Sequence, residues 1–295
     1  VNLEVLSSVS ADERAKIMDI QNHLAEIYRP KSYYNKLRVT LKKAKSLGAM
    51  QLRELISAKI NNNNTIALCP QHLPKFHPHF DMIITGILLR SPRTLIALID
   101  NRQKLQWRRT LMSRWKKELV LRIAECDSSS IRANTVPELG SKREPWCSAE
   151  DKIGLTEESQ AKAEDQADLI LSRITWVSSL TPQEYLALLA VGDVMLDPFP
   201  FGGGVTTLES IAVCTPVITL PSAQSVPQLA AGMLYEMKLS KSLQEFLIPE
   251  SAQKYLDNTL LMLRGPSHLQ EQGLAHIEPT FNITNVRREV CGHAR

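Results

Sequence analysis

The residues with the clearest chemical potential lie in one glycine-rich stretch, residues 197–210, with the sequence DPFPFGGGVTTLES. The stretch follows an apolar run that is typical of a strand, and it opens a pattern that is typical of a helix. Its three consecutive glycines, Gly202, Gly203 and Gly204, let the backbone approach a ligand closely and adopt positive φ. The unpaired N–H groups at the start of a helix, together with the helix dipole, favour an anion such as a diphosphate. The pattern therefore predicts an anion site at this turn.

Polar side chains just after the glycines strengthen that prediction. Thr206 and Thr207 add hydroxyl donors, and Glu209 lies about one turn into the helix, where a carboxylate can accept hydrogen bonds from two ribose hydroxyls. The spacing of Thr206 and Glu209 is also that of a capping box, which needs no ligand. The stretch is neither GxGxxG nor GxxxxGK[ST], so it lacks the fingerprints of a dinucleotide-binding fold and of a P-loop ATPase. The glycines and the strand before them favour the ligand site.

Apolar runs alternate with helical patterns from residue 65 onward, which favours an α/β fold built on a doubly wound, Rossmann-like parallel sheet. Ligands of such sheets bind beyond the carboxyl ends of the strands. Strands are expected at residues 65–69, 95–99, 174–177, 193–196 and 217–220, with a last short strand at 246–248. Helices are expected at residues 80–89, 105–124, 181–190, 206–213, 226–237 and 251–263.

The same patterns divide the chain into three parts. Residues 1–60 form a helical N-terminal segment, with one helix starting at Ser10 and a second over 34–60. Residues 61–265 form the α/β domain, and 266–295 a C-terminal tail. A polar stretch at 126–165, with little apolar periodicity, is expected to be a surface loop insertion. The sequence begins with Val1 and not Met, so we expect a fragment or a processed chain.

Composition is that of an ordinary globular protein, with 43% apolar and 22% charged residues among 295. The net charge of +4 suits an anionic ligand but does not favour a nucleic-acid surface. No apolar run reaches the length of a membrane span, and no signal peptide is visible. The five cysteines are odd in number and form no CxxC pair. They favour a reducing compartment, cytoplasmic or nuclear, with Cys69 and Cys214 as small core residues.

No metal site is predicted. His72, His77 and His79 form the main histidine cluster, but no acidic or cysteine pattern accompanies them. No Asp-x-Asp motif is present to hold a divalent ion beside a diphosphate.

Three motifs resemble one family in the same order. The segment 195–222, MLDPFPFGGGVTTLESIAVCTPVITLPS, resembles the donor-binding segment of the O-linked N-acetylglucosamine transferase and SPINDLY-like glycosyltransferases. The segment 69–78, CPQHLPKFHP, looks like that family's first strand and loop in the same lobe. The segment 179–185, SLTPQEY, looks like the loop and helix that frame the base. The resemblance covers roughly residues 65–263 without the insertion, and it implies the C-terminal catalytic lobe of a GT-B enzyme.

The resemblance implies roles for residues in the first two segments. Lys75 matches the lysine that contacts the donor diphosphate, where its charge stabilises the departing nucleotide and so acts catalytically. The alternative is an ordinary surface lysine in a loop. Gln71 matches a residue that holds the diphosphate or the sugar by hydrogen bonds.

Further roles follow for the donor-binding helix, which the glycines Gly203 and Gly204 precede. Thr206 and Thr207 match a pair that binds phosphate, and Glu209 falls where the family has a ribose-binding carboxylate. Tyr185 falls where an aromatic or histidine side chain lies near the base, although its helical spacing fits a core residue equally well. Val205 departs from the pattern, because animal members commonly have a histidine there.

The function implied is the inverting, metal-independent and cofactor-free transfer of N-acetylglucosamine from UDP-GlcNAc to Ser or Thr hydroxyls of a protein acceptor. SPINDLY-like relatives use GDP-fucose, which is the closest alternative. Nothing in the sequence resembles the family's amino-terminal lobe, where a proposed catalytic base lies. A non-catalytic binding or scaffold lobe is therefore a further alternative, whereas a nucleic-acid-binding module is disfavoured by the weak, scattered positive charge.

Overall fold

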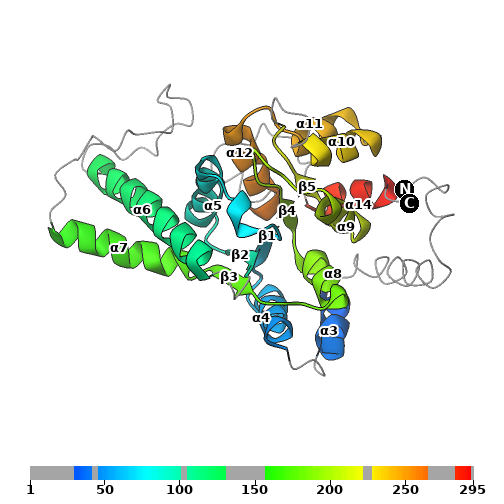
Figure 1. Cartoon of the computed structure of the whole chain (residues 1–295), viewed down its shortest axis with the longest axis horizontal. Coiled ribbons are helices and arrows are strands. Elements are labelled where there is room, and N and C mark those ends of the chain that lie inside the picture. Colours follow the sequence, from blue (N-terminus) through cyan, green and yellow to red (C-terminus); the bar gives the residue numbers. More distant parts are fainter. Residues whose placement is uncertain are drawn as a thin grey trace.

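A five-stranded parallel sheet forms the centre of the molecule (Figure 1). The computed structural model describes residues 30–41, 46–100, 105–130, 157–221, 228–264 and 283–293. The strand order is β3-β2-β1-β4-β5, and every neighbouring pair runs parallel. The predicted α/β fold class with a doubly wound parallel sheet is confirmed. The strands are β1 (Thr65–Cys69), β2 (Thr94–Ile99), β3 (Ile174–Val177), β4 (Val194–Leu196) and β5 (Val217–Ile218).

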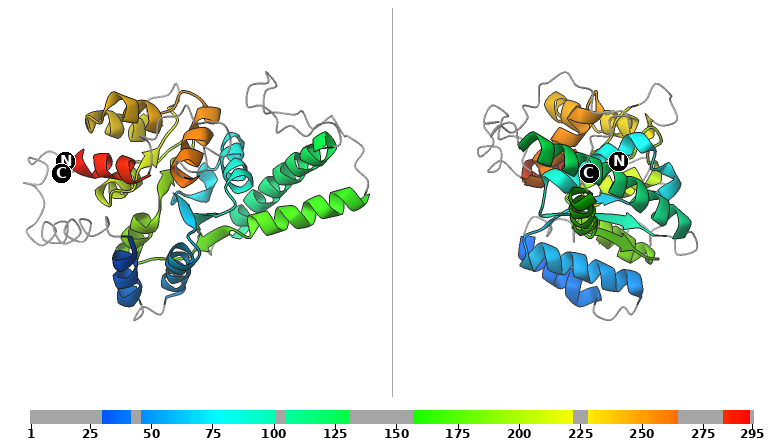
Figure 2. Two further views of the ribbon diagram at one scale, coloured as in Figure 1. Left: turned by 180° about the vertical axis from the view of Figure 1, so that it is seen from behind. Right: turned by 90° about the vertical axis from the view of Figure 1, so that its left-hand side faces the viewer.

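Helices surround the sheet on both faces (Figures 1 and 2). The described helices are α3 (Pro30–Leu41), α4 (Leu47–Asn61), the short 3₁₀ helix η1 (Leu73–Lys75), α5 (Pro78–Arg90), α6 (Leu105–Ser130), α7 (Glu157–Leu171), α8 (Pro182–Val191), α9 (Val205–Ala212), α10 (Leu229–Glu236), α11 (Lys241–Leu247), α12 (Ala252–Arg264) and α14 (Ile283–His293).

The central strand β1 shows why the sequences of the strands are continuous apolar runs. Its side chains alternate between two hydrophobic clusters, one on each face of the sheet. Ala67 and Cys69 join the cluster that includes α5, α6, α7 and α12. Ile66 and Leu68 join the cluster that includes α3, α4 and α8. Because both faces are covered, neither set of side chains can be polar.

The order of the strands in the sheet changes side at β1, so that a switch point lies between β1 and β4. From β1 it passes through α5 to β2 and then on to β3, all on one side of β1. After β3 it crosses through α8 to β4, on the other side of β1, and continues through α9 to β5. Ligands of open parallel sheets bind at such a switch point, beyond the carboxyl ends of the strands. The loops that follow β1 and β4 are therefore the ones that matter for function.

The start of α8 forms as its sequence predicts. Thr181 is the N-cap, its Oγ1 accepts the N–H of Glu184 at 3.3 Å, and the Glu184 carboxylate accepts the N–H of Thr181 at 2.8 Å. Pro182 occupies the first helical position, where its missing N–H costs nothing.

The predicted strand at 246–248 is wrong, because these residues end helix α11. Leu243, Phe246 and Leu247 are all buried, and their spacing places them on one helical face. The Leu247 carbonyl still accepts the N–H of Thr219 at 3.0 Å, so the end of the run lies beside β5 without joining the sheet.

The helical segments differ from prediction at three places. The helix expected over 34–60 is two helices, and Ser46 caps the second by accepting the Ala49 N–H at 3.0 Å. Helix α4 packs against the sheet rather than extending from it, whereas Ser10 lies outside the described residues. The predicted insertion at 126–165 is helical at both ends, since α6 reaches Ser130 and α7 begins at Glu157. Helices α6 and α7 lie side by side and project away from the sheet (Figures 1 and 2).

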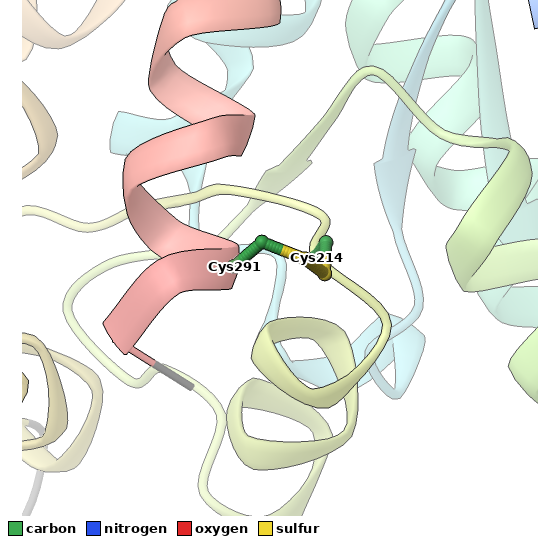
Figure 3. Close-up of a disulfide and its surroundings, with 2 residues drawn as sticks. All are labelled: Cys214 and Cys291. Carbon is green, nitrogen blue, oxygen red and sulfur yellow. A yellow bond between two sulfur atoms is a disulfide. The ribbon is translucent and has the colours of Figure 1, made fainter. Parts of the chain in front are cut away.

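The cysteines correct another prediction. Cys214 is not a free core residue, because it forms a disulfide with Cys291 of α14 (Figure 3). The bond joins the end of α9 to a helix in the predicted tail. Cys69 is a buried free thiol, as predicted. A disulfide is typical of oxidising compartments, so the cysteines no longer indicate a reducing one.

Within the described residues, no helix is both long enough and apolar enough to cross a membrane. In the same part of the chain, no three His, Cys, Asp or Glu side chains are grouped so that they can hold a metal ion. His77 instead caps α5, where its Nδ1 accepts the N–H of His79 at 3.2 Å.

Candidate functional site

Lys75 links the loop after β1 to the loop after β4. It ends η1, and its Nζ donates hydrogen bonds to the Gly202 carbonyl and to the Gln71 Oε1, both at 2.9 Å. The ammonium also lies 4.9 Å from the ring centroid of Phe201, a cation–π contact. Gly202 is 127 residues away in sequence, and the switch point brings the two loops together. The alternative interpretation of Lys75 as a solvated surface lysine is therefore not supported.

Gln71 extends this link to the helix that follows the glycines. The side chain is buried, and its Nε2 donates to the Oγ1 of Thr206. Because its Oε1 accepts from Lys75, the amide joins the lysine to the start of α9. Three residues chosen from the sequence thus form one hydrogen-bonded chain across the switch point.

Gly203 lies so close to this chain of hydrogen bonds that any larger residue would have to displace it. A Cβ on Gly203 would lie 2.4 Å from the Gln71 Nε2 and 2.5 Å from the Thr206 Oγ1. Contacts this short force the side chains apart. Gly204, the N-cap of α9, has more room, since a Cβ there would meet only Leu229 at 3.5 Å. A residue larger than glycine at position 203 would therefore disturb the hydrogen bond between Gln71 and Thr206, whereas one at 204 would not.

The start of α9 carries no side-chain cap. The cap is Gly204, and Thr206 is already inside the helix, so the capping-box interpretation of Thr206 and Glu209 is wrong. The Thr207 N–H donates to the Gly204 carbonyl at 2.9 Å. The N–H groups of Val205 and Thr206 make no hydrogen bond within the described part of the chain. Two backbone donors at the positive end of the helix dipole thus face away from the body of the helix.

Two side-chain hydroxyls, one at the turn and one on α8, are buried without a hydrogen-bond partner in the described part of the chain. One is the Oγ1 of Thr207, which lies 3.2 Å from the position of a Cβ on Gly203. The other is the phenol of Tyr185 on α8. Burying an unpaired hydroxyl costs about 1–3 kcal/mol. Such a cost is common at a site that binds a polar ligand, because the ligand supplies the missing bond.

Tyr185 and Glu209 lie on the neighbouring helices α8 and α9. Burial raises the pKa of Tyr185, and the charge of Glu209 raises it further. Burial also raises the pKa of Glu209, whose side chain is partly exposed. Among the described residues, neither side chain forms a hydrogen bond with Lys75 or Gln71. The structure therefore brings Lys75, Gln71 and Thr206 together by hydrogen bonds, whereas no hydrogen bond joins Tyr185 or Glu209 to them.

Asp197 is a further residue of the site that the sequence did not single out. Its carboxylate is buried at the end of β4, accepts the Gly203 N–H at 2.5 Å and accepts the Thr219 hydroxyl at 2.8 Å. Burial raises the pKa of Asp197 to about 6, against the two hydrogen bonds and the charge of Lys75, which lower it. A Cβ on Gly202 would lie 2.3 Å from the same carboxylate. Asp197 therefore helps to fix the conformation of the glycine turn. In the sequence, the feature that points to it is an acidic residue between a strand and a run of glycines.

The arrangement can bind an anion of moderate size. An ammonium, an amide and two free backbone N–H groups lie around one turn. An incoming phosphate would replace the carbonyl of Gly202 as a partner of Lys75, and Gln71 as a partner of Thr206. The phosphate oxygens would accept from the Lys75 ammonium and from the Thr206 hydroxyl, which now accepts from Gln71. A charged oxygen is a stronger acceptor than a neutral one.

The fold is similar to that of solved structures, whereas the sequence comparisons find no match. No family model matches the sequence, and no curated protein matches it. Among solved structures, the chain is similar to a mutant of the Thermobaculum terrenum O-GlcNAc transferase, with 18% sequence identity and a TM-score of 0.44. The match covers 79% of this chain and 38% of that protein's chain. This chain therefore spans less than two fifths of the length of that transferase.

Proposed function

We propose that this chain is the donor-binding lobe of a GT-B glycosyltransferase similar to the O-linked N-acetylglucosamine transferase and SPINDLY-like family. Its donor would be UDP-N-acetylglucosamine, and its acceptor a Ser or Thr hydroxyl of a protein. The single observation that supports this most is the meeting of Lys75 with the glycine turn at the switch point. A lysine, free helix N–H groups and a close-packed glycine turn are groups that can bind a diphosphate, which supports the proposal.

In this proposal each group acts on the donor in a defined way. The acceptor oxygen forms a bond to the anomeric carbon while the bond from that carbon to the β-phosphate oxygen breaks. The electron pair of the broken bond goes to the phosphate, where Lys75 and the N–H groups of Val205 and Thr206 stabilise the new charge. The hydroxyl proton goes to a base that this set of residues does not include. Glu209 would bind the ribose hydroxyls, and Tyr185 would lie near the base of the nucleotide.

No divalent metal is needed for this scheme, because a lysine and helix N–H groups supply the positive charge that a cation supplies elsewhere. The proposal therefore keeps the expected absence of a metal and of a cofactor. A cytoplasmic or nuclear site of action is a separate proposal, which the disulfide between Cys214 and Cys291 disfavours.

Two alternatives share the same turn. A GDP-fucose donor would use the same diphosphate site and differ at the base and at the sugar. A non-catalytic lobe would bind the nucleotide without transfer. It is favoured by Val205, which is 70% exposed at the first position of α9 and offers no side-chain donor.

Calorimetric titration with UDP, UDP-GlcNAc, GDP and GDP-fucose tests the proposal. We expect UDP and UDP-GlcNAc to bind, and Lys75→Ala to weaken that binding about 10- to 100-fold, the value of one or two charge-assisted hydrogen bonds. Lys241→Ala is the matched control, because that side chain is 90% exposed on α11. A folded protein that binds none of the four would contradict the proposal. Preference for GDP would select the fucose alternative, and binding without sugar transfer by the whole enzyme would select the non-catalytic one.

A further inference from the structure

The side chain of Arg114, on helix α6, contacts the loop that carries Lys75. The Nη2 of Arg114 donates to the carbonyl of Phe76 at 2.8 Å, and Phe76 is the residue directly after Lys75. The same guanidinium donates from Nε and Nη2 to the two carboxylate oxygens of Asp81, each at 2.6 Å. One side chain thus joins α6, α5 and the end of η1.

The carboxylate of Asp81 is what fixes this guanidinium. Its side chain is 11% exposed, and its Oδ1 also accepts the indole N–H of Trp115 at 2.8 Å. Burial raises the pKa of Asp81, whereas the hydrogen bonds from Arg114 and Trp115 lower it. A planar guanidinium that bonds both carboxylate oxygens has a defined orientation, and a lysine at that position would not reproduce it.

The position of Phe76 is also fixed, by contacts of its ring and of its backbone. Its ring lies 5.8 Å from that of Phe80 and 6.0 Å from that of Trp115. Its N–H donates to the Leu73 carbonyl at 3.1 Å, and the carbonyl of Lys75 accepts the next N–H at 2.9 Å. The backbone on the carboxyl side of Lys75 therefore has its polar groups paired, with Arg114 as the only partner from α6 among the described residues. A lysine side chain reaches a fixed point only if its own backbone is fixed.

We propose that Arg114 is a positioning residue, which holds the Phe76 carbonyl and thereby places the Lys75 ammonium at the glycine turn. Its consequence for ligand binding rests on the proposed function. Its consequence for Lys75 itself does not, and the two can be measured separately.

The first experiment measures the reactivity of the Lys75 amine in Arg114→Lys. An ammonium at position 114 still neutralises Asp81, but it cannot bond both carboxylate oxygens and the Phe76 carbonyl at once. We expect acetylation of Lys75 by a small amine-reactive reagent, followed by mass spectrometry of its peptide, to become several-fold faster. Arg122→Lys is the matched control, because Arg122 lies on the same helix and bonds Glu118 instead. An unchanged Lys75 rate in Arg114→Lys would overturn the proposal.

The second experiment compares UDP with uridine, which lacks the diphosphate. We expect Arg114→Lys to weaken UDP binding about tenfold and to leave uridine binding unchanged. In a Lys75→Met background the same substitution should have no further effect on UDP, because positioning an absent group changes nothing. Equal losses for UDP and uridine would show a general structural role and overturn the proposal. If the native protein binds no UDP but the Lys75 rate changes as expected, the proposed function fails and the positioning role stands.

A paired variant keeps the test decisive if Arg114→Lys does not fold. Asp81→Asn with Arg114→Gln removes both charges of the buried pair, so that no charge is left without a partner. The same increase in Lys75 reactivity is expected, and its absence would overturn the proposal.

Discussion

We predict that reduction of the disulfide between Cys214 and Cys291 lowers the free energy of unfolding by several kcal/mol. The two residues are 77 positions apart, so the bond closes a long loop in the unfolded chain. The loop-closure relation gives an entropy change of about −15 cal/mol/K, or about 4.5 kcal/mol at 25 °C. In this relation the stabilisation comes from the unfolded chain, which gains conformational freedom when the bond is reduced. We therefore expect the oxidised protein to be more stable by nearly this amount.

Urea unfolding with and without a dithiol reductant measures the difference. The fluorescence of Trp115 and Trp176, which are both buried, reports unfolding of the core. With a denaturant slope of about 3 kcal/mol/M, reduction should lower the midpoint by about 1.5 M. Cys291→Ala should show the lower midpoint in both conditions. Equal midpoints for the oxidised and reduced native protein, or a peptide map without the bridged pair, would refute the reasoning.

Three further predictions concern the turn. Gly203→Ala should weaken UDP binding at least about tenfold in calorimetry, because its Cβ would overlap the side chains of Gln71 and Thr206; unchanged affinity would show that the turn can open freely. The folded pKa of Asp197, about 6, lies above the unfolded value of 3.8, so its stabilising protonated form is lost as the pH rises through that window. Asp197→Asn should therefore be more stable than the native protein at pH 8 by up to about 3 kcal/mol, with the gap closing towards pH 4 in urea unfolding; a gap that widens on acidification would contradict the sign. Thr207→Val removes a buried hydroxyl without a partner, so it should raise the free energy of unfolding by about 1 kcal/mol while weakening UDP binding, and a destabilised variant would mean that the hydroxyl is satisfied.

Much of the sheet could be predicted because its strands are buried on both faces. The run at 65–69 is apolar after Thr65, without the alternation of a strand that has one solvated face. The N-cap Thr181 and Pro182 after it mark a helix by local chemistry alone. The run at 246–248 failed because three apolar residues fit either period, and the helical partner Leu243 decides between them. Short apolar runs carry too little information to separate a strand from a helix end.

The central part of the site was also accessible from sequence, for a topological reason. Lys75 and Gly202 follow strands β1 and β4, and neighbouring parallel strands present their carboxyl ends at one edge. The role of Asp197 was not accessible, because it depends on how the backbone folds back after β4. The disulfide was not accessible either, since Cys291 meets Cys214 only through the docking of α14 against α9.

A crystal structure with bound UDP is the most direct test of the diphosphate site. The account predicts phosphate oxygens within about 3 Å of the Lys75 Nζ and of the N–H groups of Val205 and Thr206, with the bond between Gln71 and Thr206 broken or shared. UDP bound elsewhere, or at this edge with Lys75 still on the Gly202 carbonyl and no phosphate contact, would contradict it.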